Sequence, residues 1–104
     1  MDTAGQVFIP AIVIGELEYG AMYSQQVEKN KSNIKQLVQA YPILSIDKDT
    51  AEVYGRIKAV LRSKGKPIPE NDIWIAALAQ QHNMLLISRD RHFSEIEGIS
   101  IEEW

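Results

Sequence analysis

The sequence predicts a single α/β domain over residues 1–104, with a mostly parallel sheet of about four strands. Apolar β-type runs alternate with segments of helical periodicity along the chain, which is typical of α/β proteins. The run at residues 84–88 is almost entirely apolar, as expected of a strand buried on both faces of a parallel sheet. A length of 104 residues, 45% hydrophobic and 24% charged, suits one small globular domain.

The first half of the chain shows two helices between two strands. The elements predicted here are a strand at 7–9, a helix at 11–23, a polar segment at 24–33 that holds a break or loop, a helix at 34–41 and a strand at 43–46. Pro10 ends the first run and suits the first turn of the following helix. The spacing of Ile34, Leu37, Val38 and Tyr41 indicates the second helix.

The second half repeats the alternation. Residues 47–50 offer N-cap side chains, and an apolar stripe predicts a third helix that stops at Gly65; the stripe is formed by Val53, Ile57, Val60 and Leu61. Residues 66–69 contain two prolines and predict an extended loop. The remaining elements are a helix at 73–81 opened by Asn71 or Asp72, a strand at 84–88, a loop at 89–96 and a strand at 99–101.

Charge and composition exclude several protein classes. Lys plus Arg number 11 and Asp plus Glu number 14, so the net charge of −3 does not suit a general nucleic-acid binder, although bases around an acidic site could still contact RNA. The chain has no cysteine, which excludes disulfides and thiolate metal sites and fits a reducing cytoplasm. No apolar run approaches the ~18 residues of a membrane span, and no secretory signal is visible. We therefore expect a cytoplasmic protein without a membrane partner.

Three acidic residues stand out by context. Glu16 lies in an otherwise apolar helix, Asp72 lies at the start of an alanine-rich helix, and Asp90 follows the most hydrophobic strand by two residues. Ligands of open α/β sheets lie beyond the carboxyl ends of the strands. Neighbouring carboxylates resist joint ionisation unless a cation offsets them, and Mg²⁺ or Mn²⁺ prefers such oxygen ligands. A bound cation could then activate water for attack on a phosphodiester.

Each of these acids also has a purely structural interpretation. Asp72 could cap its helix, with Asn71 as the rival cap, and Asp90 could be a turn residue. Glu16 could lie on a partly exposed helix face. Arg89 and Arg91 flank Asp90 and are candidates for contact with RNA phosphates. Five bases between residues 56 and 66 could contact RNA or form a solvated helix face.

Three sequence blocks resemble the VapC-type PIN domains. Residues 8–20 are similar to the strand and helix that carry a Glu before Leu, here Glu16-Leu17. Residues 69–77 resemble the Asp-x-x-Ile-Ala-Ala helix, and residues 85–93 resemble the strand that ends in Ser-x-Asp and is followed by Phe. The blocks occur in the family's order and cover nearly the whole chain.

The resemblance implies a PIN-like three-layer fold and a metal-dependent endoribonuclease, the toxin of a type II toxin–antitoxin pair. Glu16, Asp72 and Asp90 carry over as catalytic and metal-site acids for Mg²⁺ or Mn²⁺. Asn71 and Ser88 carry over as supporting hydrogen-bond groups. The implied partners are an RNA substrate and a cognate antitoxin that inserts a segment beside the acids.

The family's opening strand and helix, with the fourth metal-site acid, have no counterpart before Val7. The domain is therefore expected to be N-terminally truncated, with residues 1–6 disordered or atypical and with Asp2 as a possible substitute acid. A homodimer or higher oligomer could cover the exposed strand edges. The alternative is a catalytically impaired PIN remnant that binds an antitoxin or itself, and a weaker one is another metal-dependent, phosphatase-like α/β domain.

Overall fold

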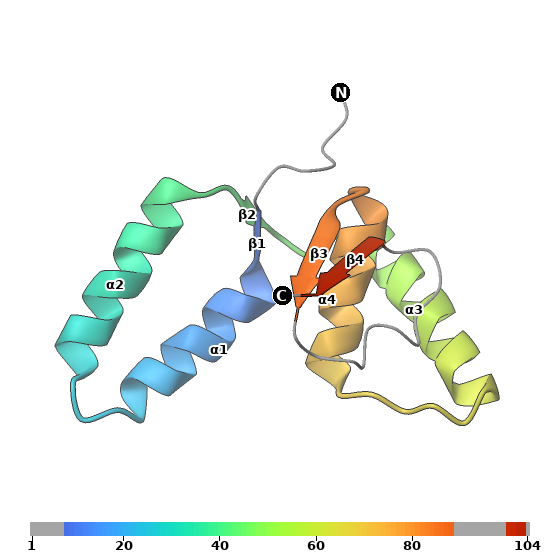
Figure 1. Ribbon diagram of the computed structural model, residues 1–104, viewed down its shortest axis with the longest axis horizontal. Coiled ribbons are helices and arrows are strands. Elements are labelled where there is room, and N and C mark those ends of the chain that lie inside the picture. Colours follow the sequence, from blue (N-terminus) through green and yellow to red (C-terminus); the bar gives the residue numbers. More distant parts are fainter. Residues whose placement is uncertain (1–7, 89–99, 104) are drawn as a thin grey trace. The chain divides into compact units, whose positions relative to one another are not determined.

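The computed structural model describes residues 8–88 and 100–103, which fall in two compact units, one within Val7–Ser45 and one within Ile46–Trp104. The first unit contains β1 (Ile9–Pro10), α1 (Ala11–Met22), α2 (Val27–Ala40) and β2 (Ile43–Leu44). The second contains α3 (Lys48–Ser63), α4 (Glu70–Gln81), β3 (Leu85–Ser88) and β4 (Ser100–Glu103) (Figure 1).

The first unit is a helical hairpin closed by a short pair of strands. The helices α1 and α2 pack side by side, and β1 pairs in parallel with β2 through Ile9 and Ile43 (Figure 1). Ala21 from α1 and Ile34 from α2 are buried. Ser24 organises the turn between the helices, because its hydroxyl accepts a 2.9 Å hydrogen bond from the Asn30 side chain. The hairpin therefore has a small core and a well-bonded turn.

The break predicted within residues 24–33 is confirmed at residues 24–26, but α2 begins at Val27, earlier than the predicted helix at 34–41. The first two turns of α2 carry polar side chains from Glu28 to Asn33, nearly all of them exposed. Val27 and Leu37 are half-buried and lie at helical spacing from Ile34. A helix with such a narrow apolar stripe shows little periodicity in its sequence, and its polar start looks like a loop.

The second unit begins with a capped helix. Asp47 is the N-cap of α3, and its carboxylate accepts a 3.0 Å hydrogen bond from the Thr50 amide, while the Asp47 amide donates to the Thr50 hydroxyl. Val53, Ile57 and Leu61 form the buried stripe. Val60 is predicted to share that stripe but is 43% exposed. The buried residues Val53, Ile57 and Leu61 follow one another at intervals of four, and position 60 lies on the neighbouring face of the helix.

The helix α4 is the centre of this unit's core. Its buried residues lie on several sides of the helix and are Ile73, Ile75, Ala76, Ala77, Leu78 and Ala79. The small alanine side chains allow close packing, and α4 contacts both α3 and β3. The helix starts at Glu70, three residues before the predicted start.

The strands form two parallel pairs among the described residues, β1 with β2 and β3 with β4. In the second pair, Leu85 lies opposite Ser100 and Ser88 lies opposite Glu103. The predicted strands at 84–88 and 99–101 are thus found at Leu85–Ser88 and Ser100–Glu103, and their parallel direction is confirmed. A single sheet of about four strands and the single domain over 1–104 stay predictions. In the described part of the chain, no helix has the length and apolar character needed to span a bilayer.

Candidate active site

Asp72 is the third residue of α4 and is half-buried. Its amide donates a 3.1 Å hydrogen bond to the carbonyl of Pro69, the N-cap residue, so its backbone is fixed within the first helical turn. The interpretation of Asp72 or Asn71 as the helix cap is wrong, since Pro69 holds that position with no side-chain cap. A carboxylate in this first turn is favoured by the positive end of the helix dipole.

The carboxyl end of β3 and the first turn of α4 lie at the same end of the second unit. A short turn after Gln81, in which Asn83 has a φ of 52°, reverses the chain from α4 into β3 (Figure 1). The strand therefore runs back along the helix, toward the end where Asp72 lies. Ser88 is the last residue of β3. Asp90, Arg89 and Arg91 follow it and lie outside the described residues, so their roles stay predictions.

Glu16 lies in the middle of α1 and is exposed. It lines a groove of about 400 Å³ along the hairpin, and the other lining residues are Leu17, Gly20, Ala21, Asn30, Asn33, Ile34 and Leu37. The exposed helix face considered from the sequence is therefore confirmed for Glu16.

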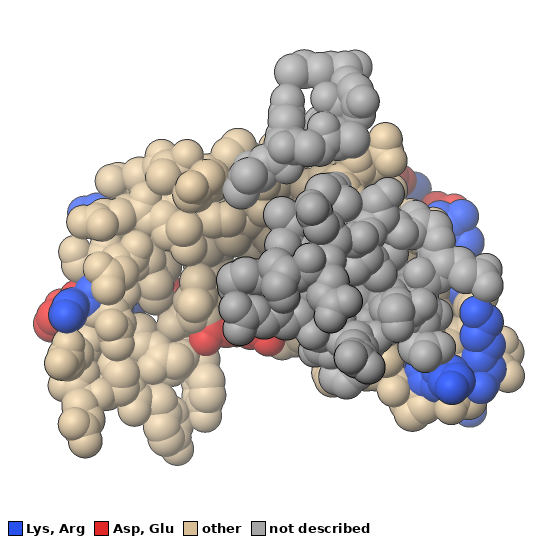
Figure 2. Space-filling view, in the orientation of Figure 1, with Lys and Arg blue, Asp and Glu red and all other residues tan. Residues whose placement is uncertain are grey.

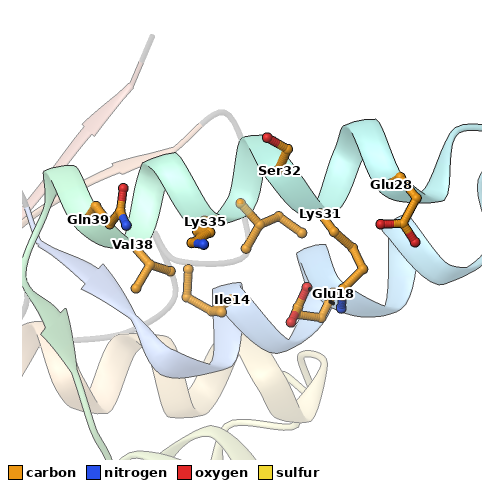
Figure 3. A pocket seen from close by; sticks show the side chains of 9 residues that line it. Ile14, Glu18, Glu28, Lys31, Ser32, Lys35, Val38 and Gln39 are labelled. Carbon is orange, nitrogen blue, oxygen red and sulfur yellow. Dashed lines mark ion pairs between the residues drawn. The ribbon is translucent and has the colours of Figure 1, made fainter.

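A second groove, of about 640 Å³, runs between α1 and α2 and has a more polar lining. Glu18 from α1 and Lys31 from α2 point toward each other across it and form an ion pair at 3.5 Å (Figure 3). Both side chains are more than 40% exposed, so the pair contributes little to stability. None of the predicted site residues lines this groove.

The described residues do not by themselves form a complete metal site. Within residues 8–88 and 100–103, no group of three Asp, Glu or His side chains is close enough to hold an ion. Glu16 belongs to the first unit and Asp72 to the second, while Asp90 lies beyond the described residues. The donor chemistry nevertheless fits, because all three are carboxylates, the ligands that Mg²⁺ and Mn²⁺ favour.

Sequence reasoning missed a polar and aromatic cluster that reaches the first turn of α4. Tyr54 stacks on Trp74, with ring centroids 3.9 Å apart and planes at 10°. The Tyr54 hydroxyl donates a hydrogen bond to Glu70, and the Lys58 ammonium lies 2.5 Å from the same carboxylate. We call Tyr54, Lys58, Glu70 and Trp74 the Tyr54 cluster. A sequence indication existed, since each helix contributes two of these residues four positions apart.

Hydrogen bonds within this cluster shift the pKa values of Glu70 and Lys58. The hydrogen bond from Lys58, and then the one from Tyr54, lowers the pKa of Glu70 below its usual value. The same contact with Glu70, followed by the one with Tyr54, raises the pKa of Lys58. Both shifts favour the charged forms, so the ion pair persists at neutral pH.

The basic residues between positions 56 and 66 are all exposed; they are Arg56, Lys58, Arg62, Lys64 and Lys66. Figure 2 shows Lys and Arg atoms gathered over the C-terminal end of α3. Lys58 is engaged by Glu70, which reduces the positive charge available to an RNA backbone. The structure thus confirms the solvated face, and contact with RNA stays a prediction.

The PIN domain sequence profile matches residues 1–99. This chain belongs to the PIN-domain family. Among its PIN relatives, Ribonuclease VapC2 of Haemophilus influenzae is 36% identical over 104 residues, which cover 99% of this chain and 79% of the relative. The tRNA(fMet)-specific endonuclease VapC of Shigella flexneri is 31% identical, over 96% of this chain and 76% of the relative.

Solved structures of VapBC proteins share the fold. DNA-bound VapBC from Salmonella typhimurium matches with a TM-score of 0.90 and 31% identity, covering 98% of this chain and 78% of that one. VapBC2 from Rickettsia felis, bound to a DNA fragment from its promoter, matches with a TM-score of 0.87 and 30% identity. The match covers 92% of this chain and 73% of that one. The predicted PIN-like α/β fold is confirmed. The expected N-terminal truncation stays a prediction.

Proposed function

We propose that this PIN domain is an endoribonuclease that cleaves RNA phosphodiester bonds as the toxin of a toxin–antitoxin pair. The observation that carries the proposal is the placement of Asp72 in the first turn of α4, at the end of the unit where β3 also ends. It is supported by relatives that are named ribonucleases and match almost the whole chain.

The proposed cofactor is Mg²⁺ or Mn²⁺, held by Glu16, Asp72 and Asp90. A divalent cation supplies positive charge that stabilises the charge building on a phosphodiester during cleavage. The chain's own part is to fix the ligands, and the Asp72 backbone is already held by its hydrogen bond to Pro69. Asn71 and Ser88 would orient the acids by hydrogen bonds. Arg89 and Arg91 would bind the phosphates of the substrate.

The proposed protein partner is a cognate antitoxin. This partner is suggested by solved structures that share the fold, which are of DNA-bound VapBC from Salmonella typhimurium and of VapBC2 from Rickettsia felis bound to a promoter fragment. Tyr19, Met22 and Tyr23 offer apolar surface at the end of α1, with exposures of 66%, 63% and 79%. Exposed apolar patches of this kind mark protein interaction sites. A homodimer or higher oligomer is part of the same proposal.

The deciding experiment compares RNA cleavage by the wild type and by Asp72→Asn, with Mn²⁺ or Mg²⁺ present. Asp72→Asn keeps the shape of the side chain and removes its charge. We expect at least about a hundredfold loss of activity, since several kcal/mol of transition-state stabilisation depend on the cation. Glu52→Gln is the matched control, because Glu52 is an exposed carboxylate on α3 and lies outside the proposed site.

Calorimetric titration with Mn²⁺ distinguishes the enzyme from the impaired remnant. The wild type and Glu52→Gln should bind Mn²⁺, and Asp72→Asn should bind it more weakly. Equal cleavage by the wild type and Asp72→Asn would remove the proposed mechanism. A folded wild type that neither cleaves RNA nor binds Mn²⁺ would favour the remnant that only binds a partner.

A further inference from the structure

The first turn of α4 lacks the side-chain cap that usually anchors a helix start. Pro69 occupies the N-cap position with a φ of −56° and a ψ of 143°, and its side chain carries no hydrogen-bond acceptor for the amides of the first turn. The backbone bonds of this turn run from the amides of Asp72 and Ile73 to the Pro69 carbonyl, at 3.1 and 3.2 Å. The preceding residues 62–67 are exposed.

The Tyr54 cluster supplies the missing anchor from the side of α3. The carboxylate of Glu70, the first residue of α4, accepts hydrogen bonds from the Tyr54 hydroxyl and from the Lys58 ammonium. One turn later, Trp74 stacks against the Tyr54 ring. Lys58 also donates a 3.1 Å hydrogen bond to the Tyr54 hydroxyl, so the polar contacts form a closed network. Residues from both sides of position 72 are therefore bound to α3.

Helical geometry places Asp72 away from this anchor. Residues 70 and 74 lie on the same side of a helix, whereas residue 72 is rotated by about 200° from residue 70. The contacts of residues 70 and 74 with α3 therefore fix the rotation of the first turn about the helix axis. If these contacts are lost, a small rotation or fraying of that turn would change the position of the Asp72 carboxylate.

We propose that Tyr54, Lys58, Glu70 and Trp74 position the first turn of α4 so that Asp72 presents its carboxylate to the divalent cation. This inference rests on the proposed function of Asp72 as a metal ligand. The four residues are positioning residues, because they act through the helix backbone. A plain surface ion pair is the competing explanation, since the Lys58 and Glu70 side chains are 49% and 54% exposed and such pairs contribute little to stability.

The two explanations differ in what a weakened cluster changes. A surface pair without a positioning role would leave Mn²⁺ binding unaffected. A positioning cluster would change Mn²⁺ affinity and the protection of the first-turn amides while global unfolding shifts little. Partners that orient metal ligands directly change affinity about 10–100-fold when mutated. Because this cluster acts through one helical turn, we expect a smaller change of about 3–10-fold.

The test uses the double variant Tyr54→Phe/Lys58→Gln in the full chain. It removes both polar contacts to Glu70 and leaves the aromatic stack and the sequence around Asp72 intact. The matched control is Lys48→Gln, because Lys48 also lies on α3 but is 92% exposed and 3.9 Å from Asp49. Calorimetry measures the Mn²⁺ dissociation constant, and hydrogen–deuterium exchange measures the amides of residues 72 and 73. Thermal unfolding monitors global stability.

The double variant should bind Mn²⁺ about 3–10-fold more weakly than Lys48→Gln and exchange the two amides faster. Lys58→Arg should stay close to the wild type, because it keeps a cation beside Glu70. An unchanged Mn²⁺ dissociation constant in the double variant would overturn the positioning role, whatever happens to exchange. If the wild type itself binds no Mn²⁺, the metal site of the proposed function fails, and this inference fails with it.

Discussion

The side chain of Gln81, at the end of α4, donates a 3.0 Å hydrogen bond to the carboxylate of Asp47, the N-cap of α3. The Thr50 hydroxyl, which is fully buried, also contacts the Gln81 side-chain oxygen. The start of α3 is therefore tied to the end of α4, while the Tyr54 cluster ties the later part of α3 to the start of α4. Two polar contacts at opposite ends hold the apolar interface between these helices.

Acidification should weaken the cap at Asp47. The hydrogen bonds from the Thr50 amide and then from Gln81 lower the pKa of Asp47 below its usual value of 3.8. A carboxyl with a lowered pKa in the folded state stabilises the protein above pH 3.8 and loses that contribution as the pH falls through the lowered value. The excess free energy of unfolding of the wild type over Asp47→Asn should therefore shrink below about pH 4.

Urea unfolding between pH 3 and pH 7 measures this difference. Asp49→Asn is the control, since Asp49 lies in the same first turn but its side chain is 74% exposed. Its ion pair with Lys48 is long, at 3.9 Å, and therefore weak. A gap between wild type and Asp47→Asn that stays constant down to pH 3 would contradict the assignment.

Removing the Thr50 hydroxyl should destabilise the second unit. Thr50→Val keeps the shape of the side chain but leaves the Asp47 amide and the Gln81 oxygen without a partner. Losing hydrogen bonds to a buried hydroxyl costs about 1–3 kcal/mol. Thr50→Ser keeps the hydroxyl and should cost less, about 1 kcal/mol for the lost methyl group. Chemical denaturation of both variants checks the order, and equal losses would contradict it.

Leu78 is the largest fully buried apolar side chain among the described residues, with 0% exposure. Leu78→Ala removes its packing in the middle of α4 and leaves a cavity, so it should cost about 2–5 kcal/mol. Val60→Ala is the matched truncation on the exposed part of α3, where the side chain is 43% exposed. Denaturant unfolding should show a much smaller loss for Val60→Ala. Similar losses of unfolding free energy in the two variants would contradict the assignment of Leu78 to the core.

Gly65 lies two residues beyond the end of α3 and has a φ of +67°, in the left-handed region. An added Cβ would meet nothing within 4 Å, so conformation and not space requires glycine here. Gly65→Ala should therefore cost about 1–2 kcal/mol, whereas Gly65→Asn should cost less because asparagine tolerates this region. Thermal unfolding compares the two variants. A neutral Gly65→Ala would indicate that the loop relaxes to another conformation.

Much of the fold could be predicted from local chemistry. Asp47 and Gly65 are strong helix-end residues, and the structure places the ends of α3 next to them. The start of α4 was missed because Pro69 is a weak N-cap, and residue preferences favoured Asn71 or Asp72. The start of α2 was missed because its first two turns are polar and its apolar stripe is narrow.

The candidate site was only partly predictable for a similar reason. Asp72 and Glu16 stand out as acids in largely apolar helices, and both lie on helices that the sequence predicts. Tyr54 and Lys58 do not stand out, because their role depends on a partner helix whose register the sequence does not specify. Their contacts with Glu70 and Trp74 arise only when α3 and α4 pack.

The helical hairpin of α1 and α2 has few buried side chains. Among the described residues of α1 and α2, Ala21 and Ile34 are the ones classed as buried. Segments with so few buried contacts open locally at a small free-energy cost. Cleavage by a protease should therefore begin in this hairpin, near the turn at residues 23–26, and a protein partner that covers α1 would also protect the chain from degradation.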